Sequence, residues 1–208
     1  MLNIETITVG AFAMNCYLLY DDDSKDAIYI DPGMEAERLI KRVEELGLNL
    51  NYIINTHAHI DHVAEAGTVQ KHFNTNFYLH REELPLLDAL PEQARMFGLK
   101  TGPAPTVNKY MNDGDEIELG KFQGKIYHTP GHSPGSISIH WGEDVFVGDC
   151  LFMDSIGRTD LYKGDYDQLI HSIKTKLLTL PESTNVHSGH GPSTTIGREK
   201  IHNPFLQS

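Results

Sequence analysis

Four side chains that commonly bind metal ions lie within six residues, in the segment His57-Ala58-His59-Ile60-Asp61-His62. Imidazole nitrogen and carboxylate oxygen are the usual protein ligands of zinc and of several other divalent metals. The segment directly follows an expected buried strand at 51–55, so its side chains can converge on one point without help from distant parts of the chain. The spacing therefore predicts a metal site. The alternative is a polar loop of solvated histidines.

Three further segments place a ligand-type residue at the end of a strand-like run. His132 follows the run at 123–128, Asp149 ends the run Val145-Phe146-Val147-Gly148-Asp149, and His190 follows a run near Asn185. Glycine close to each of them lets the backbone approach a neighbour closely. Because ligands gather at strand ends along one edge of a layered sheet, we expect these residues to join the histidine segment.

The full candidate set holds five histidines and two carboxylates. One tetrahedral zinc ion takes about four ligands, and a catalytic one takes about three protein ligands and a water. Seven candidates are too many for one ion and suit two, with a carboxylate as the bridge. Neither cysteine is a candidate, which argues against a structural zinc site. Cys16 and Cys150 lie in apolar contexts, and we interpret them as buried free thiols, with a disulfide as the alternative.

The elements that must position these residues alternate between strand-like and helical patterns. A strand at 27–30 ends at the turn signal Asp31-Pro32-Gly33, and a helix with one apolar face follows at 36–46. The pattern after the histidine segment predicts one helix over 61–72. We expect a single layered α/β domain over residues 1–208. The remaining expected elements are strands at 77–79, 115–119, 123–128, 135–140, 144–148 and near 185, helices at 82–89, 167–178 and 196–202, and a loop that holds Gly102, Pro103 and Pro105.

The composition is that of an ordinary globular chain, with 39% hydrophobic and 22% charged residues. A net charge of −12 disfavours general nucleic-acid binding, because phosphates would be repelled. The chain has no apolar run near roughly 18 residues, and its N-terminus lacks a basic region followed by a long apolar stretch. We therefore expect a cytoplasmic protein with a small-molecule substrate and with no nucleic-acid or membrane partner. The sequence leaves the oligomeric state open.

Taken together, these motifs resemble those of the metallo-β-lactamase superfamily, and within it the small hydrolases similar to glyoxalase II (hydroxyacylglutathione hydrolase). The resemblance covers nearly the whole chain and is far more specific for the superfamily than for a substrate. The matching segments are Asn15-Cys16-Tyr17-Leu18, Asp31-Pro32-Gly33, Thr56 to His62, Thr129 to Ser136, Gly148-Asp149, Gly157-Arg158-Thr159-Asp160, Gly189-His190-Gly191-Pro192 and Asn203-Pro204-Phe205.

This resemblance implies a fold and a division of the seven candidate ligands between two metal ions. The implied fold is a four-layer αββα sandwich of two similar halves. The implied metals are two divalent ions, zinc by expectation, with iron or manganese as alternatives. The ligand sets that the resemblance implies are His57, His59 and His132 for the first ion, Asp61, His62 and His190 for the second, and Asp149 as the bridge.

The activity that the resemblance implies is hydrolysis of an acyl thioester, such as an S-acyl glutathione. Two ions about 3.5–4 Å apart can share a water and lower its pKa toward about 7, and the resulting hydroxide attacks the carbonyl. Asp61 is then both a ligand and the residue that orients the water. Arg158 is expected to face the pocket and contact an anionic substrate, and the alternative is a structural ion pair with Asp160.

Some alternatives stay open. The persulfide dioxygenases also resemble this chain, including at Gly157-Arg158-Thr159-Asp160, and they bind one iron ion, so a mononuclear iron oxidoreductase is the second candidate function. Larger glyoxalase II enzymes have Glu and Tyr where this chain has Gly191-Pro192. Asp31 either forms a plain turn or supports a histidine ligand by accepting a hydrogen bond. The remaining histidines are expected to be hydrogen-bonded or solvated, with His128 and His187 as candidates for the same supporting role.

Overall fold

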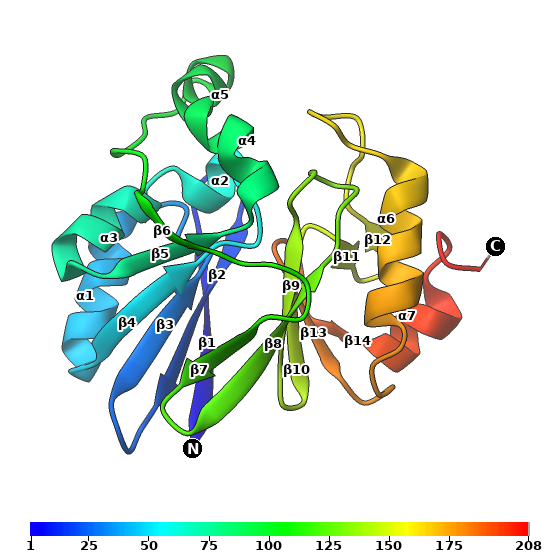
Figure 1. The fold of residues 1–208 in the computed structure, drawn as a ribbon, viewed down its shortest axis with the longest axis horizontal. Coiled ribbons are helices and arrows are strands. Elements are labelled where there is room, and N and C mark those ends of the chain that lie inside the picture. Colours follow the sequence, from blue (N-terminus) through cyan, green and yellow to red (C-terminus); the bar gives the residue numbers. More distant parts are fainter. Residues whose placement is uncertain (208) are drawn as a thin grey trace. The chain divides into compact units, whose positions relative to one another are not determined.

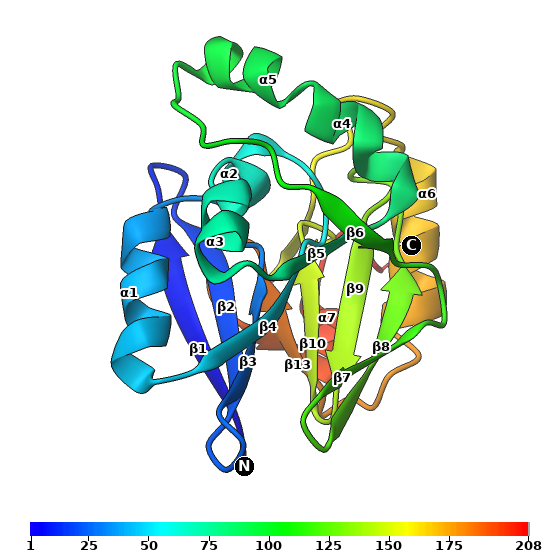
Figure 2. The ribbon, with the colours of Figure 1, turned by 60° about the vertical axis from the view of Figure 1, so that its left-hand side comes forward.

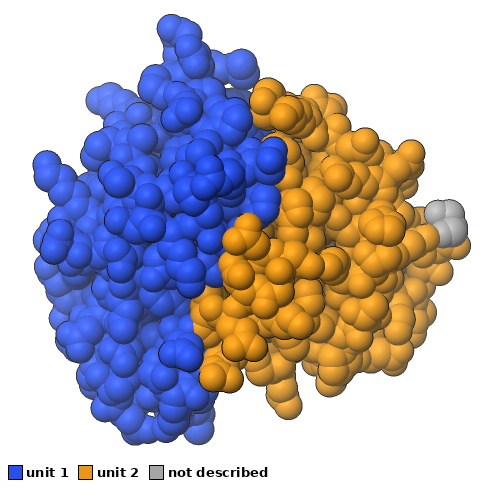
Figure 3. Space-filling model, in the orientation of Figure 1, with its two compact units in different colours: residues 1–111, 118–122 blue, residues 112–117, 123–208 orange. Residues whose placement is uncertain are grey.

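A computed structural model describes residues 1–207 of the chain. The chain divides into two compact units, which Figure 3 colours blue and orange. The N-terminal unit comprises Met1–Met111 and Glu118–Phe122, and the C-terminal unit comprises Asn112–Ile117 and Gln123–Ser208. The expectation of a single domain over residues 1–208 stays a prediction. None of the helices described over residues 1–207 is long and apolar enough to cross a membrane.

The N-terminal unit is built on a six-stranded sheet with the order β1-β2-β3-β4-β5-β6 (Figure 1). The first three strands are antiparallel neighbours, and β3 to β6 are parallel, which brings the carboxyl ends of β3, β4 and β5 to one edge. The β1–β2 hairpin was not predicted. The strands are β1 (Leu2–Val9), β2 (Met14–Asp21), β3 (Asp26–Ile30), β4 (Asn49–Ile54), β5 (Asn76–Leu79) and β6 (Val107–Tyr110).

Helices α1 (Ala36–Leu46) and α3 (Ala66–Phe73) cover one face of this sheet (Figure 2). Helix α1 confirms the predicted helix at 36–46. Its apolar stripe buries Leu39 and Val43, and Gly47 ends it with a left-handed φ of 62° that suits glycine.

The single helix expected over 61–72 is instead two helices, α2 (Ile60–Val63) and α3. The reason lies at Glu65, whose φ of −118° is not helical. The carboxylate of Glu65 accepts a 2.6 Å hydrogen bond from the backbone N–H of Ala36, and its own N–H donates to the carbonyl of Gly33. Glu65 therefore satisfies an N–H at the start of α1 instead of continuing its own helix.

A helical segment follows β5, made of η1 (Arg81–Glu83), α4 (Leu84–Asp88) and α5 (Leu90–Phe97). The first two confirm the helix expected at 82–89. Helix α5 was not predicted. Pro91 lies in its first turn, where the missing N–H of proline is harmless, and Gly98 ends it in a left-handed conformation.

A second six-stranded sheet has the order β14-β13-β10-β9-β8-β7. All of its residues belong to the C-terminal unit except Glu118, Leu119 and Phe122. Strands β8, β9 and β10 form an antiparallel meander, and β10 pairs with β13 in parallel. A two-stranded hairpin of β11 and β12 lies outside this sheet. The strands are β7 (Glu116–Leu119), β8 (Phe122–His128), β9 (Ile137–Trp141), β10 (Asp144–Gly148), β11 (Leu151–Phe152), β12 (Ser155–Ile156), β13 (Asn185–Ser188) and β14 (Thr194–Thr195).

Two helical stretches pack on this sheet through one apolar cluster. Helix α6 (Tyr166–Ser172) begins where the carboxylate of Asp165 accepts a hydrogen bond from the Gln168 N–H, and it continues as the wider turn η2 (Ile173–Leu177). These two elements confirm the helix expected at 167–178, and α7 (Ile196–His202) confirms the C-terminal one. The cluster includes Val145, Val147 and Val186 of the sheet with Leu169, Ile173, Leu177 and Ile196 of the helices.

Candidate metal centre

The histidine segment lies at the carboxyl end of β4, as predicted. After Ile54 the chain passes through buried Asn55 and Thr56 and reaches His57. The side-chain amide of Asn55 donates a 2.7 Å hydrogen bond to the carbonyl of His62, which closes the loop on itself. Three of the four ligand-type side chains are buried, those of His57, His59 and His62. This burial excludes the alternative of a polar loop with solvated histidines.

Asp31, at the carboxyl end of the neighbouring strand β3, orients two of these histidines. Its carboxylate accepts hydrogen bonds from His62 Nδ1 at 2.9 Å and from the Thr56 N–H and hydroxyl at 2.7 and 2.6 Å. The single hydroxyl proton of Thr56 goes to Asp31, so Thr56 Oγ1 accepts from His57 Nδ1 at 3.0 Å. Both imidazoles therefore carry their proton on Nδ1, and their lone pair lies on Nε2, the nitrogen that a metal would meet.

Asp31 combines the two roles that the sequence left open. It turns the chain with a φ of 52°, and it also supports the histidines. Ligand-type atoms of Asp31, His57 and His62 come within 4.8 Å of one another, a spacing that by itself would also suit an ion. We favour the supporting role, because the carboxylate oxygens already accept three hydrogen bonds and because His62 faces Asp31 through Nδ1.

Gly33 brings the backbone of this turn against the histidine segment. A Cβ atom at Gly33 would lie 1.8 Å from the carbonyl oxygen of Asp61, far inside any real contact.

On the loop itself, Asp61 Oδ2 lies 3.8 Å from His62 Nε2. Two ligands about 2.1 Å from one tetrahedral ion lie about 3.4 Å apart, so this spacing is close to that of a bound pair.

In the C-terminal unit, Asp149 lies close to two histidines. Strands β10 and β13 are parallel, so Asp149 and His190, which follow them, lie at the same edge. The Asp149 Oδ2 atom is 3.6 Å from His190 Nε2 and 3.7 Å from His132 Nε2. At these distances the carboxylate oxygen of Asp149 could share an ion with either imidazole.

His132 is oriented by the backbone of the loop after β12. Its Nδ1 donates a 2.8 Å hydrogen bond to the carbonyl of Arg158, which again leaves the lone pair on Nε2. The preceding residue, Gly157, is packed so tightly that a Cβ atom would lie 1.8 Å from the carbonyl oxygen of Asp149 and 3.2 Å from His132 Nδ1. Only glycine fits here without moving either group.

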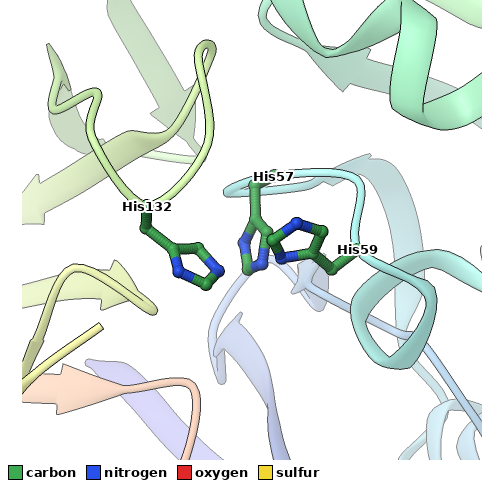
Figure 4. Close-up of side chains that lie close together, drawn as sticks. All are labelled: His57, His59 and His132. Carbon is green, nitrogen blue, oxygen red and sulfur yellow. The ribbon is translucent and has the colours of Figure 1, made fainter. Parts of the chain in front are cut away.

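Six of the seven predicted ligands form two close groups of donor atoms. The donor atoms of His57, His59 and His132 all lie within 4.8 Å of one another, and so do those of Asp61, His62 and His190. Figure 4 shows the imidazole rings of the first group turned toward one another. Imidazole and carboxylate donors without thiolate fit a catalytic divalent ion, and the Nδ1 hydrogen bonds present the correct nitrogens.

The side chain of Arg158 forms the ion pair that the sequence offered as its alternative role. Its guanidinium donates to both carboxylate oxygens of Asp160, at 2.7 and 2.8 Å, and both side chains are exposed. This hydrogen-bonded pairing lowers the pKa of Asp160 to about 2. A contact of Arg158 with substrate stays a prediction.

The remaining side chains with predicted roles are hydrogen-bonded as expected. His187 bonds the carboxylate of Asp144 at 2.8 Å, and His128 Nε2 donates to the carbonyl of Pro134 at 3.0 Å. Both cysteines are buried free thiols, which confirms their interpretation, and burial raises the pKa of Cys150 to about 12.

Sequence reasoning missed two residues that touch the histidine segment. The buried carboxylate of Glu83 accepts from the N–H of Ala58, and the side chain of Gln93 bonds both Ala58 and Ile60. Neither lies in a ligand-like pattern, although Glu83 comes four residues after the end of β5. The one available signal was an acid within an otherwise ordinary helical stretch.

Comparison with known proteins places the chain in a family. The model of the Metallo-beta-lactamase superfamily matches residues 9–190. Hydroxyacylglutathione hydrolase GloC of Haemophilus influenzae is 47% identical over 211 residues, which cover 100% of this chain and 99% of that protein. The structure of BLEG-1 B3 metallo-beta-lactamase matches with a TM-score of 0.92 at 42% identity, covering 99% of this chain and 100% of that one. TTHA1623 in a di-iron-bound form matches with a TM-score of 0.86 at 39% identity, covering 97% and 100%.

These similarities extend over the whole chain and agree with the geometry of the candidate centre. They confirm the predicted fold class, the αββα sandwich, and the predicted enzyme class, a metal-dependent hydrolase. The clustered histidine and carboxylate donors support binding of divalent metal. The chain belongs to the metallo-beta-lactamase superfamily.

Proposed function

We propose that this protein is a binuclear hydrolase of acyl thioesters, with S-acyl glutathiones as the leading substrate class. The observation that carries the proposal is the position of Asp149, whose Oδ2 lies 3.6–3.7 Å from a histidine of each donor group. A carboxylate shared in this way suits a bridge between two ions. The 47% identity to a hydroxyacylglutathione hydrolase along the full chain supports a thioester as substrate.

The proposed ligands divide between the two ions as the donor groups do, and zinc is the proposed metal. A pair of such ions, when bound, polarises the substrate carbonyl and lowers the pKa of a water held between them. The protein's part is to hold the donors in place, and the Nδ1 hydrogen bonds of His57, His62 and His132 do this. The assignment is His57, His59 and His132 to the first ion, Asp61, His62 and His190 to the second, and Asp149 to both.

Asp61 is the residue that we propose orients the attacking water. Its side chain is 17% exposed, whereas that of its neighbour His62 is fully buried, so Asp61 is the carboxylate of the loop that solvent and substrate can reach. The leaving thiolate needs little protonation, because a thiol has a pKa of about 8.5 and departs readily as the anion. Arg158, on an exposed loop, is proposed to contact an anionic part of the substrate when its pairing with Asp160 opens.

The test is a hydrolysis panel with metal-loaded protein. S-lactoylglutathione, a simple acyl thioester without glutathione and a cephalosporin are compared by kcat/KM. We expect the glutathione thioester to be the best substrate. A rate no better than that of the simple thioester would remove the glutathione claim. Preferred hydrolysis of the cephalosporin would replace the thioesterase proposal, an outcome that the similarity to a B3 metallo-beta-lactamase makes worth measuring.

The metal is tested on protein purified without added ions. About two zinc ions per chain are expected. Two iron ions with thioester hydrolysis retained would change the metal and keep the reaction, as the similarity to a di-iron protein allows. About one iron per chain, with oxygen uptake on glutathione persulfide, would overturn the hydrolase in favour of the mononuclear oxidoreductase.

The proposed setting is the cytoplasm, where glutathione is abundant and free thiols such as Cys16 and Cys150 persist. The proposed partner is a small molecule rather than a nucleic acid or a membrane. The net charge of −12 supports this, since a strongly acidic chain repels phosphate groups. Fractionation of the native cell tests the location.

A further inference from the structure

The side chain of Gln93, in the middle of α5, bonds the backbone of the histidine segment at two points. Its Oε1 accepts a 3.0 Å hydrogen bond from the N–H of Ile60, and its Nε2 donates to the carbonyl of Ala58 at 3.2 Å. The same Nε2 donates to the carbonyl of Leu86 in α4 at 2.8 Å. One amide group thus joins α4, α5 and the loop that carries the proposed ligands.

Glu83, just before α4, makes a third contact of the same kind. Its carboxylate is fully buried, and Oε2 accepts a 2.8 Å hydrogen bond from the N–H of Ala58. Burying a carboxylate costs free energy unless the carboxylate is hydrogen-bonded, and the bond from Ala58 offsets part of that cost. Ala58 therefore has both its N–H and its carbonyl bonded by residues from one helical segment.

These contacts fall on the residues that alternate with the proposed ligands. Ala58 lies between His57 and His59, and Ile60 lies between His59 and Asp61. Ile60 is also the first residue of α2. The N–H of a first helical residue has no acceptor within the helix, and the side chain of His59 does not cap α2. Gln93 supplies that acceptor from another helix, which fixes the direction in which α2 leaves the loop.

We propose that Gln93 and Glu83 are positioning residues that hold this backbone in its ligating conformation before an ion binds. Turning either peptide plane at Ala58 would swing His57 and His59 apart, so fixing both groups of Ala58 pre-organises the first donor group. The segment from η1 to α5 is thereby part of the metal centre. The inference rests on the metal centre of the proposed function and not on its substrate.

The experiment measures how fast zinc-loaded protein loses its ions to an excess of a chromogenic chelator. Gln93→Leu keeps the volume and removes all three hydrogen bonds. We expect release to be about 10-fold faster, the lower end of the range for residues that orient metal ligands. Glu92→Gln is the matched control, an exposed neighbour on the same helix that should release zinc at the native rate. Urea unfolding of the metal-free proteins shows whether the fold itself has been weakened.

Native release from folded Gln93→Leu, or equally fast release from Glu92→Gln, would overturn the proposal. If Gln93→Leu does not fold, Gln93→Glu provides the same test, since it keeps an acceptor for Ile60 and loses the donor to Ala58. The Glu83 contact is tested by rescue: Glu83→Gln keeps an oxygen for the Ala58 N–H and should release zinc more slowly than Glu83→Ala. Because the readout uses metal release alone, a failed thioesterase assay leaves the positioning proposal standing. Native protein that binds neither zinc nor any other divalent metal would end both proposals.

Discussion

The N-terminal unit carries four ligand-type residues on one loop, whereas the C-terminal unit carries three on three separate loops. In the first, a network of Asp31, Asn55, Glu83 and Gln93 holds one continuous stretch of backbone. In the second, each ligand follows its own strand, and the contact that orients His132 is a backbone carbonyl. The first arrangement depends on one loop conformation, and the second depends on the sheet that brings three strand ends together.

The largest effect is expected at the residue that both donor groups would share. Asp149→Ala removes the proposed bridge, so bound metal should fall from two ions to at most one per chain. Thioester hydrolysis should fall by about a thousandfold, since a metal contributes several kcal/mol to the transition state. Metal analysis and kcat/KM measure both effects. Asp144→Asn, at the other end of β10, is the control, and a variant at Asp149 that retained two ions would refute the bridge.

The loop's dependence on one conformation predicts the next effect. Asp31→Asn keeps the shape and tolerates the left-handed φ, but it loses acceptors for His62 and Thr56. We expect metal affinity to fall by about 10–100-fold, as for other residues that orient ligands. Competition with a chelator measures the affinity. Asp26→Asn, at the start of β3, should bind metal normally, and an unchanged affinity in Asp31→Asn would mean that the loop holds its histidines without support.

A matched pair of glycines compares the two units directly. Gly33→Ala and Gly157→Ala each push a Cβ atom to within 1.8 Å of a backbone oxygen beside a proposed ligand. Each should destabilise the protein by about 1–3 kcal/mol, the usual result of overpacking. Urea unfolding measures this loss. If the histidine loop of the N-terminal unit is more rigid than the ligand loops of the C-terminal unit, Gly33→Ala should lose more stability than Gly157→Ala. The reverse order would contradict this difference between the two units.

The smallest effect is expected at exposed Arg158. Arg158→Ala should raise KM for S-lactoylglutathione and leave kcat unchanged, because a uniform binding contact is removed. Uncharged thioesters should be unaffected, and equal changes for both would exclude recognition of the anion. The pKa of Asp160, now about 2, should rise toward its usual value. Because the pKa of Asp160 is depressed in the folded protein, the Arg158–Asp160 pair stabilises the folded state at neutral pH. This stabilisation is lost as the pH falls toward 2. Titration of Asp160 followed by NMR would measure the change.

Local patterns predicted much of this protein. Helix α1 with its terminal Gly47, the strand before His57 and the helix at 196–202 follow from periodicity and stop signals. The β1–β2 hairpin was missed because β2 is buried along most of its length and so lacks an alternating pattern. The break between α2 and α3 was missed because it depends on a hydrogen bond from the N–H of Ala36 to the carboxylate of Glu65, 29 residues further along the chain.

The sequence by itself determined which donors are present and that one loop holds four of them, because ligands within six residues need only a local turn to converge. Tertiary structure decided the rest. It set Asp149 at nearly equal distances from His132 and His190, and it brought Gln93 to a loop 33 residues earlier in the chain. Such contacts depend on which strand ends and helices become neighbours, and no local pattern of residues encodes that.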